Sequence, residues 1–261
     1  MQLMPRISIV TPSYNQAEYL EDAITSVLSQ DYPNLEYIII DGGSTDRSLE
    51  VIEKHASHIQ YYVSERDNGQ AHAINKGLKR ITGDIWSYLC SDDMLAPGAL
   101  RECVAQFEAS GADVVYGDCN FITADGKISR CKKSRPFHMN RLIRSNFIWQ
   151  PSTFLRKNVL ATYGYFDENM HYAMDYEYWL RIGDAVKFQY VPRVLSNYRH
   201  HSSSKTMSST LRMVAEARDV QKKYGAGLLA DWSYLSFAIW GQYSYRIRRK
   251  LFDWLASYRG G

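Results

Sequence analysis

The most constraining feature of the sequence is a short apolar run that leads into two adjacent acidic residues. Residues Ile85–Leu89 are apolar enough to form a buried strand, and Asp92 and Asp93 follow closely. Two neighbouring carboxylates disfavour each other's ionised forms, so the pair is costly at the end of a buried strand unless a cation offsets it. Mg²⁺ and Mn²⁺ take oxygen ligands and share them with substrate phosphates. The stretch 84–97 therefore predicts either a metal and diphosphate site or an acidic turn that caps a helix starting near Pro97.

Strands and helices alternate in the first part of the chain. Apolar runs at Ile7–Val10 and Tyr37–Ile40 predict buried strands, and helical apolar spacing begins near Gln16 and Asp46. This alternation predicts an α/β fold with parallel strands and right-handed crossovers. Ligands of such sheets bind at the carboxyl ends of the strands. We therefore expect the polar residues that follow these strands to share one edge of the sheet: Thr11, Asp41 and Asp92.

Asp41 is followed by Gly42 and Gly43, which permit close backbone approach and positive φ. Its carboxylate can accept hydrogen bonds from a base or ribose, or it can cap the next helix. The dinucleotide fingerprint G-x-G-x-x-G is absent after both early strands. A run from His58 to Val63 predicts a third strand. The turn Asp67–Gly69 then precedes a helix whose polar residues either reach the site or stay in solvent, namely Asn75 and Lys76.

Composition bounds the class of protein. A chain of 261 residues with 45% hydrophobic and 23% charged residues can hold one large α/β domain with an appendage. Its four cysteines lack metal-binding spacing, which predicts reduced thiols in a cytosolic protein. The amino terminus lacks the pattern of a signal peptide. No window reaches the roughly 18 apolar residues of a membrane span.

The carboxyl-terminal part of the chain is basic and aromatic. From Thr206 onward there are nine Lys and Arg against four Asp and Glu, whereas the preceding part is mildly acidic. We expect two parts, a domain at 1–205 and a helical extension at 206–261. The aromatic stripe from about Leu228 fits either peripheral contact with a membrane or packing on the domain or a second subunit. This charge distribution argues against nucleic acid as the partner.

Two later segments carry candidate functional residues. Asp125–Gly126 predicts a hairpin turn, and 129–144 is a basic, irregular segment that either covers an anionic ligand or is simply solvated. In 170–184, Asp175 faces one side of a predicted helix. Glu177 lies about 200° around the helix from it, so we expect one acid to face a pocket and the other to face water.

By its ordered motifs, the chain resembles family 2 glycosyltransferases of the GT-A fold over roughly residues 5–205. The matching segments are Ser8–Asn15, Asp41–Asp46, Asp67–Gly77, Ser91–Asp93, Asp175 with Tyr178–Arg181, and Tyr198–His201. The resemblance implies a GT-A (Rossmann-like) mixed, mainly parallel sheet flanked by helices, with the helical extension added at the carboxyl end.

The resemblance also implies roles for individual residues. Asp175 matches the catalytic base, and a divalent cation, Mn²⁺ or Mg²⁺, would be held by Asp92, Asp93 and His201. Residues implied to bind the nucleotide are Thr11, Pro12, Ser13, Tyr14, Asp41, Gly43, Ser44, Asp67, Gly69, Asn75, Lys76, Ser91 and Asp92. Residues expected near the donor or acceptor sugar are Asp118, Trp149, Gln150, Glu177 and Arg181.

One position departs from the family pattern. Many relatives carry Asp or Asn where this chain has Cys90. If the metal motif is counted from there, its first acid is missing, and Asp92 becomes the first choice as metal ligand. The departure implies weaker metal binding or a water in place of the missing ligand.

The resemblance implies an inverting transfer of a sugar from a UDP-sugar to a hydroxyl of a glycan or lipid-linked acceptor. We expect a role in bacterial surface polysaccharide synthesis, with a cytoplasmic location, contact of the tail with the inner face of the cell membrane, and a homo-oligomer as the alternative use of the tail. Two other functions stay open at this point: nucleotidyl transfer that makes a sugar nucleotide, and non-catalytic binding of one.

Overall fold

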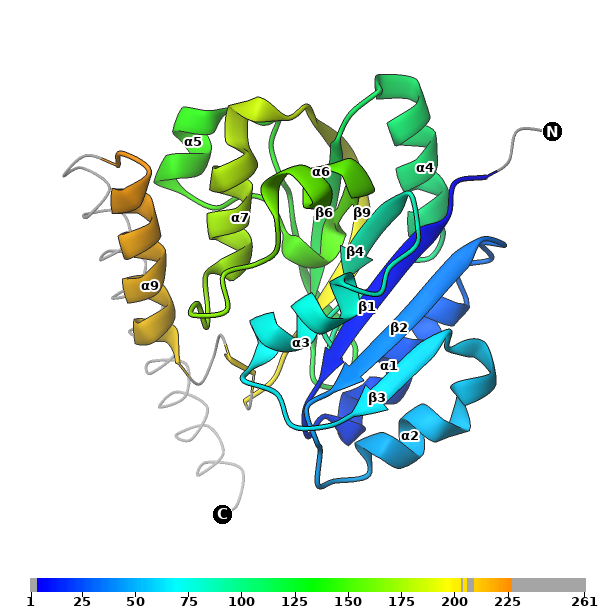
Figure 1. The fold of residues 1–261 in the computed structure, drawn as a ribbon. Helices are drawn as coiled ribbons and strands as arrows, with labels where there is room; N and C mark the ends of the chain where they lie inside the picture. Colours follow the sequence, from blue (N-terminus) through cyan, green and yellow to red (C-terminus); the bar gives the residue numbers. More distant parts are fainter. Residues whose placement is uncertain (1–3, 203, 206–208, 227–261) are drawn as a thin grey trace, which may run out of the picture.

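The computed structural model describes residues 4–202, 204–205 and 209–226, which form a mixed sheet covered by helices on both faces (Figure 1). Its strands are β1 (Ile7–Ser13), β2 (Leu35–Asp41), β3 (Tyr61–Ser64), β4 (Ile85–Tyr88), β5 (Met94–Leu95), β6 (Val114–Thr123), β7 (Ile128–Lys132), β8 (Thr153–Arg156) and β9 (Phe188–His200). They are ordered β3-β2-β1-β4-β8-β6-β9-β5, and β7 pairs with β6. The first four are parallel, as are β6 and β9, while β8, β5 and β7 pair antiparallel.

Helices form a layer on each face of the sheet. They are α1 (Ala17–Leu28), α2 (Ser48–Lys54), α3 (Gln70–Leu78), α4 (Ala99–Ser110), α5 (Met139–Arg144), α6 (Lys157–Tyr163), α7 (Met174–Ile182) and α9 (Thr210–Lys223). Short 3-10 turns occupy η1 (Ala56–His58), η2 (Gln150–Ser152) and η3 (Gly183–Ala185). In Figure 1, α3, α6 and α7 lie in front of the sheet and α1 and α2 behind it, while α9 runs beside α7.

Two hydrophobic cores follow from the alternation of side chains along the strands. Ile7 and Ile9 of β1 pack with α1, α2 and α4 on one face. Val10 turns to the other face and packs with α3, α5, α6 and α7, which share a core with Trp86 and Trp179. A strand buried on both faces reads as a continuous apolar run, which is why the strands near the amino terminus were predictable.

Helix α3 lies unusually close to β1 because it carries a glycine at the contact. A Cβ on Gly77 would lie 2.3 Å from Cγ1 of Val10 and 3.3 Å from Cγ1 of Ile40. Real Cβ atoms essentially never come this close to another atom, so helix α3 can lie at this distance from the sheet only because residue 77 is a glycine. Because the turn Asp67–Gly69 leads into α3, this close packing also places that turn against the edge of the sheet.

The fold confirms the predicted α/β sheet flanked by helices. The predicted strands at Ile7–Val10 and Tyr37–Ile40 are confirmed within β1 and β2. The strand expected from His58 starts only at Tyr61, because η1 occupies the preceding residues.

The remaining differences concern the later part of the chain. The expectation of an irregular 129–144 segment was wrong: the turn at Gly126 (φ 80°) folds β7 back onto β6, and α5 ends the segment. Within the extension expected at 206–261, the described part contains α9, and the aromatic stripe from Leu228 lies outside the described residues. Among the described helices, none is long and apolar enough to cross a membrane.

We expect Gly77→Ala to lower the free energy of unfolding by about 1–3 kcal/mol, because overpacking against Val10 outweighs the gain in helix propensity. Urea denaturation of Gly77→Ala, Val10→Ala and the double variant measures this. Val10→Ala removes the clashing methyl group and leaves a cavity of its own. The double variant should therefore be more stable than the sum of the two single effects. Strictly additive effects would contradict the contact.

Candidate active site

The carboxyl ends of β1, β2 and β4 meet at one edge of the sheet. Strand β1 lies between the other two, with Ser13 opposite Asp41 and Val10 opposite Tyr88. The chain leaves β4 and passes directly into the acid pair Asp92 and Asp93. The three polar segments that the sequence predicted to be neighbours are therefore brought together by the parallel register.

Asp41 organises the loop that follows β2. Its buried carboxylate accepts hydrogen bonds from the backbone N–H groups of Gly43 (3.1 Å) and Ser44 (2.8 Å) and from the hydroxyls of Ser44 (2.5 Å) and Ser64 (2.6 Å). Asp41 does not cap the next helix, since α2 begins at Ser48 after Arg47; it orders the local backbone, and a contact with a base or ribose stays a prediction. Gly43 has a φ of 78°, a conformation that favours glycine.

The end of β1 is buried up to Ser13, and the exposed ring of Tyr14 follows it. Thr11 is buried and its hydroxyl lies 3.0 Å from the Tyr37 hydroxyl, and Pro12 and Ser13 are also buried. The Ser13 carbonyl accepts the Gly42 N–H at 2.8 Å, which ties this segment to the Asp41 loop. Tyr14 is 60% exposed, so its ring is accessible at the edge of the sheet.

The turn before α3 packs directly against the Asp41 loop. A Cβ on Gly42 would lie 2.5 Å from Oδ2 of Asp67, so the glycine allows the Asp67 carboxylate to approach this closely. Oδ1 of Asp67 accepts the Gly69 N–H at 2.7 Å, and Gly69 has a φ of 116°. These loops form one continuous rim on the nucleotide side expected from the sequence.

Two residues of α3 that were predicted to bind a nucleotide have other partners in this structure. The Asn75 amide donates to the Phe166 carbonyl and to Glu168 (both 2.9 Å) and accepts the Phe166 N–H (3.1 Å). Lys76 forms a 2.5 Å ion pair with Glu65. Asn75 is therefore used to fasten the loop before α7 to α3, and a direct nucleotide contact by it stays a prediction.

The acid pair past β4 is held by the end of β9. The buried Asp93 carboxylate accepts the Arg199 N–H at 2.9 Å, and Asp92 Oδ2 lies 2.9 Å from Nε2 of His201. The buried Arg199 guanidinium donates to the Asp92 carbonyl (3.0 Å) and pairs with Asp22 (2.8 Å). Burial, together with the Asp92 charge, raises the pKa of Asp93 well above its ordinary value.

Cys90 completes this cluster. Ligand atoms of Cys90, Asp92 and Asp93 all lie within 4.8 Å of one another, and Ser91 between them is buried. The Cys90 thiol accepts a hydrogen bond from Gln70 Nε2 at 3.1 Å, and the same amide accepts one from Lys205 Nζ at 3.0 Å. Burial and the charges of the acid pair raise the pKa of the Cys90 thiol, so it is uncharged at neutral pH. The four cysteines are free thiols, as predicted.

Asp175 lies in the first turn of α7 and faces the same region. Burial raises the pKa of both Tyr88 and Cys90, and the charge of Asp175 adds to this effect, so Asp175 acts electrostatically on groups at the end of β4. Burial raises the pKa of Asp175 itself to about 6, against backbone hydrogen bonds from Tyr176 and its own N–H that lower it. The two acidic groups singled out in the sequence therefore converge on one end of one strand.

Glu216 was missed by the sequence interpretation, although it holds the start of the helix that carries Asp175. Oε1 of this α9 residue accepts the backbone N–H groups of His171 (3.0 Å), Tyr172 (2.8 Å) and Ala173 (2.8 Å). A carboxylate in this position accepts hydrogen bonds from backbone N–H groups that would otherwise lack partners, and its negative charge complements the positive end of the helix dipole. Its negative charge also contributes to the raised pKa of Asp175. An acidic residue on a polar helix carries no local sequence signal for this role.

Glu177 points away from Asp175, as expected, but not into water. It is 3% exposed and pairs with Arg181 (2.8 Å), Lys223 (3.3 Å) and the Tyr224 hydroxyl (2.9 Å), so it joins α7 to α9. The expectation that it stays in water was wrong because α9 covers this face. Arg181 donates to Glu177 and to the carbonyls of Tyr163 and Tyr165. The charges of Glu177 and Arg181 are therefore used in contacts of α7 with neighbouring segments, away from the carboxyl ends of the strands.

The other residues predicted near a sugar lie along β6 and η2. Asp118 is buried and accepts the Ser134 N–H (2.9 Å) and the Tyr190 hydroxyl (2.8 Å). Gln150 donates to the Tyr88 carbonyl at 2.6 Å, which places η2 beside the end of β4. Trp149 is half-buried and packs edge-on against Phe121 with ring centroids 5.2 Å apart. Trp149 and Gln150 therefore adjoin the site, whereas Asp118 is used internally.

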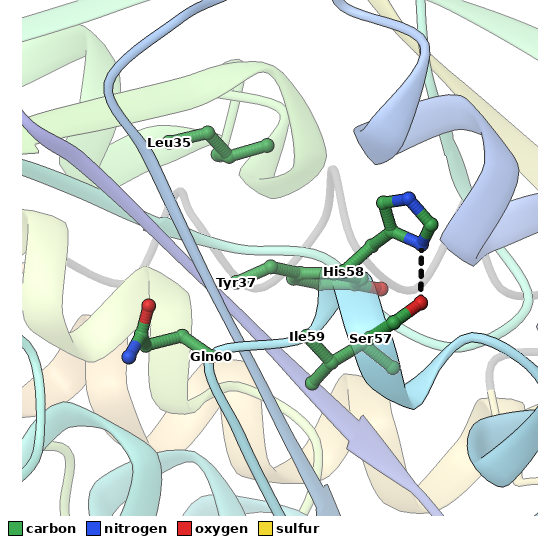
Figure 2. Close-up of a pocket in the computed structure, with 6 residues that line it drawn as sticks. All are labelled: Leu35, Tyr37, Ser57, His58, Ile59 and Gln60. Atoms are coloured by element: carbon green, nitrogen blue, oxygen red, sulfur yellow. Dashed lines mark hydrogen bonds between the residues drawn. The ribbon is translucent and has the colours of Figure 1, made fainter.

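A separate hollow of 280 Å³ lies at the opposite edge of the sheet. Figure 2 shows its lining residues, and Ser57 and His58 in it are hydrogen-bonded to each other at 3.0 Å. Its walls include Leu35, where β2 begins, and Gln60, just before β3. The hollow therefore lies at the amino ends of the strands, and of the site residues described above it shares only Tyr37, the hydroxyl partner of Thr11.

This sheet, with an acid pair beyond its fourth strand, has the architecture of GT-A glycosyltransferases. Staphylococcus aureus TarS 1–349 in complex with UDP-GlcNAc matches with a TM-score of 0.67 at 19% identity, over 82% of this chain and 65% of that one. The mannosyltransferase PcManGT of Pyrobaculum calidifontis, in complex with GDP-Man and Mn²⁺, matches with a TM-score of 0.65 at 18% identity, over 91% and 70%. At these identities the likeness concerns the fold alone.

The chain belongs to glycosyl transferase family 2, whose family model matches residues 8–174. It is 28% identical over 211 residues to an uncharacterized glycosyltransferase of Rickettsia typhi, covering 77% of this chain and 66% of that protein. It is 25% identical over 207 residues to chondroitin synthase of Escherichia coli, covering 78% of this chain and 30% of that protein. The protein is therefore a glycosyltransferase, and it spans only part of these relatives' lengths.

We expect Asp175→Asn to stabilise the protein above pH 6. The raised pKa means that the folded state binds more protons than the unfolded state between an ordinary value of 3.8 and about 6, so the wild type loses stability as the pH rises through that window. The gain should approach about 3 kcal/mol at pH 8 and vanish near pH 4. Thermal unfolding across this pH range measures it.

Glu177→Gln on the same helix is the matched control. Burial alone would raise the pKa of Glu177, but hydrogen bonds and charge from Arg181 lower it below its ordinary value. Neutralising Glu177 should therefore destabilise the protein at neutral pH. A stabilising effect of both variants, or a pH-independent effect of Asp175→Asn, would show that Asp175 is not held in a desolvated state.

Proposed function

We propose that the enzyme transfers a sugar, with inversion, from a nucleoside diphosphate sugar to a hydroxyl of a glycan or lipid-linked acceptor. The observation that carries this proposal is the convergence of the acid pair and Asp175 on Cys90 and Tyr88. One acidic group can serve the departing diphosphate, and the other can take a proton. TarS with UDP-GlcNAc and the mannosyltransferase with GDP-Man support a nucleotide-sugar donor, and we favour UDP.

The nucleotide would rest on the rim formed by the loops after β1, β2 and β3. We assign the exposed Tyr14 ring to the base side and the ordered loop around Gly43 and Ser44 to the base and ribose. Asp41 shapes this loop through the hydrogen bonds of its carboxylate. Asp67 and Gly69 close the rim next to it. These loops lie at the carboxyl ends of parallel strands, where α/β folds bind their ligands.

The donor set beyond β4 fits a divalent cation. Asp93 is a buried carboxyl whose ionisation is disfavoured by its surroundings and by Asp92, and a cation would offset both effects. Carboxylate and imidazole ligands suit Mn²⁺ and Mg²⁺, and we assign Asp92, Asp93 and His201 to the site. When bound, the cation would stabilise the negative charge that develops on the leaving diphosphate. Arg199 would fix the orientation of the acid pair through its backbone and side chain.

Asp175 is our candidate for the catalytic base. A pKa of about 6 leaves the carboxylate ionised at neutral pH yet basic enough to accept a proton in the transition state. The acceptor oxygen would lose its proton to Asp175 while it attacks the anomeric carbon. The bond between that carbon and the diphosphate oxygen would break on the opposite side, which inverts the configuration.

The biological setting follows from relatives and composition only. A polysaccharide acceptor is supported by the name of the chondroitin synthase relative, of which this chain covers 30%. Peripheral contact with a membrane, a homo-oligomer and a role in surface polysaccharide synthesis stay predictions, since the aromatic stripe on which they depend lies outside the described residues.

We expect Asp175→Asn to lower the rate of transfer by about 10²–10⁴-fold while leaving donor affinity unchanged, because only proton removal is lost. Release of nucleoside diphosphate from a panel of donors, with and without oligosaccharide acceptors, measures transfer, and calorimetry measures donor binding. The wild-type kcat/KM should fall below pH 6. Asp184→Asn, an exposed acid just past α7, is the control and should behave as wild type. Full turnover by Asp175→Asn, pyrophosphate-dependent chemistry, or binding without turnover by the wild type would each contradict the proposal.

We expect Cys90→Asp to bind Mn²⁺ about tenfold or more tightly, because a third carboxylate joins the two already present. Electron paramagnetic resonance of free Mn²⁺ during titration measures affinity without requiring turnover. Cys131→Asp places the same charge at an exposed thiol and should leave Mn²⁺ affinity unchanged. Equal effects of the two substitutions, or none at position 90, would contradict a cation site at the end of β4.

A further inference from the structure

A wall of four aromatic side chains lies beside the candidate site. The Phe121 ring packs against Trp149, Tyr198 and His200, with centroids 5.2, 5.2 and 4.8 Å away. These rings come from β6, the segment before η2, and β9. We call these four residues the aromatic wall. Aromatic faces of this kind stack well on the apolar faces of sugar rings or bases, and the function described so far gives none of these rings a role.

Two cations of β7 cover the aromatic wall. Arg130 is opposite Phe121 in the β6–β7 register, and its guanidinium carbon lies 4.9 Å from the Phe121 ring centroid. Lys132 is opposite Cys119, and its Nζ lies 5.6 Å from the same centroid. Phe121 is in turn opposite Tyr198 on β9. Cations and rings therefore share one face of three adjacent strands, a placement fixed by strand register.

These cations have no acidic counterpart. Within the described ranges, neither Arg130 nor Lys132 forms an ion pair, whereas Lys127 on the same hairpin pairs with Asp125 at 2.7 Å. Burial and the Arg130 charge lower the pKa of Lys132, as expected for an uncompensated cation. Trp149 Nε1 and His200 Nε2 are buried and lack hydrogen-bond partners in the described part of the chain. The wall thus carries positive charge and unused hydrogen-bonding groups.

The wall spans the gap between the two halves of the candidate site. His200 precedes His201, which lies 2.9 Å from the Asp92 carboxylate. At the other end, Trp149 precedes Gln150, which donates to the carbonyl of Tyr88, a neighbour of Asp175. In the sheet order, β6 and β9 lie on one side of β4, and β1 and β2, with the proposed nucleotide loops, lie on the other. The wall is therefore placed for the acceptor rather than for the nucleotide.

We propose that the aromatic wall with Arg130 and Lys132 is an acceptor subsite that binds an anionic group, a carboxylate or a phosphate, on the glycan that receives the sugar. This rests on the proposed function, because it assumes an acceptor hydroxyl delivered to Asp175. The half-buried rings of Trp149, Tyr198 and His200, which pack on the buried Phe121, would stack on the acceptor sugar, and the two cations would pair with its charge. A half-buried cation over a ring is less hydrated than a free one, which strengthens such pairing.

Binding of three oligosaccharide probes of equal length to the full-length enzyme tests the subsite. One probe is neutral, one carries uronate residues and one carries phosphodiesters. The variants are wild type, the double variant Arg130→Gln with Lys132→Gln, and Lys127→Gln as a control on the same hairpin. Calorimetry at low and high salt measures probe affinity, and a separate titration measures donor affinity.

We expect wild type and Lys127→Gln to bind an anionic probe about tenfold more tightly than the neutral one, and the double variant to lose this preference. The loss should be larger at low salt, and the uronate and phosphodiester arms identify which anion is preferred. Donor affinity should be equal in all three proteins. Equal binding of neutral and anionic probes by wild type, or a parallel loss of donor affinity in the double variant, would overturn the subsite. An absence of transfer by a wild type that still prefers an anionic probe would instead contradict the proposed function alone.

Discussion

The acid pair at the end of β4 is the constraint on which the rest of the site depends. Two carboxylates side by side in a largely buried position are unstable unless opposite charge and hydrogen-bond donors surround them. The protein supplies these from β9, whose Arg199 and His201 reach the pair across the sheet. Strand β9 pairs with β6 along its whole length, from Phe188 to His200, and this pairing brings its carboxyl end beside Asp92. A bound cation would offset the negative charge of the acid pair that the protein's own groups leave uncompensated.

The pKa of Asp175, our candidate for the base, is set by a second balance of charges, at the start of helix α7. The start of α7 offers backbone donors and a positive dipole end, which would favour ionised Asp175. Glu216 of α9 accepts the N–H of the cap residue Ala173 and of the two residues before it, its charge disfavours ionised Asp175, and burial opposes ionisation further. The net result is a carboxylate with a pKa of about 6 rather than a strongly acidic one. The position of α9, which Glu177 also secures, is therefore part of the chemistry of the site and not only of the fold.

The sequence predicted those features that depend on local pattern. Apolar runs and helical spacing identified the early strands and helices, and the order of polar strand ends identified the edge where Asp41 and Asp92 lie. Contacts between residues far apart in the chain were not predictable, because no periodicity encodes them. Asn75 fastening the loop at Phe166, Glu177 meeting α9, and Glu216 holding the start of α7 are all of this kind. Each polar residue had the right chemistry for a ligand, and tertiary packing gave it a protein partner instead.

Cys90 bears on the charge of the acid pair and lies where the charge of Asp175 is also felt. An acid at this position would add a third negative charge to a cluster that already raises the pKa of Asp93. A neutral thiol avoids that cost, and the Gln70 amide joins it to the Lys205 ammonium. Positive charge thus reaches the end of β4 from the chain beyond β9, in addition to that of Arg199. Under the proposed function, the Lys205 ammonium would add positive charge near a leaving diphosphate and would lower the dependence of the site on a tightly held cation.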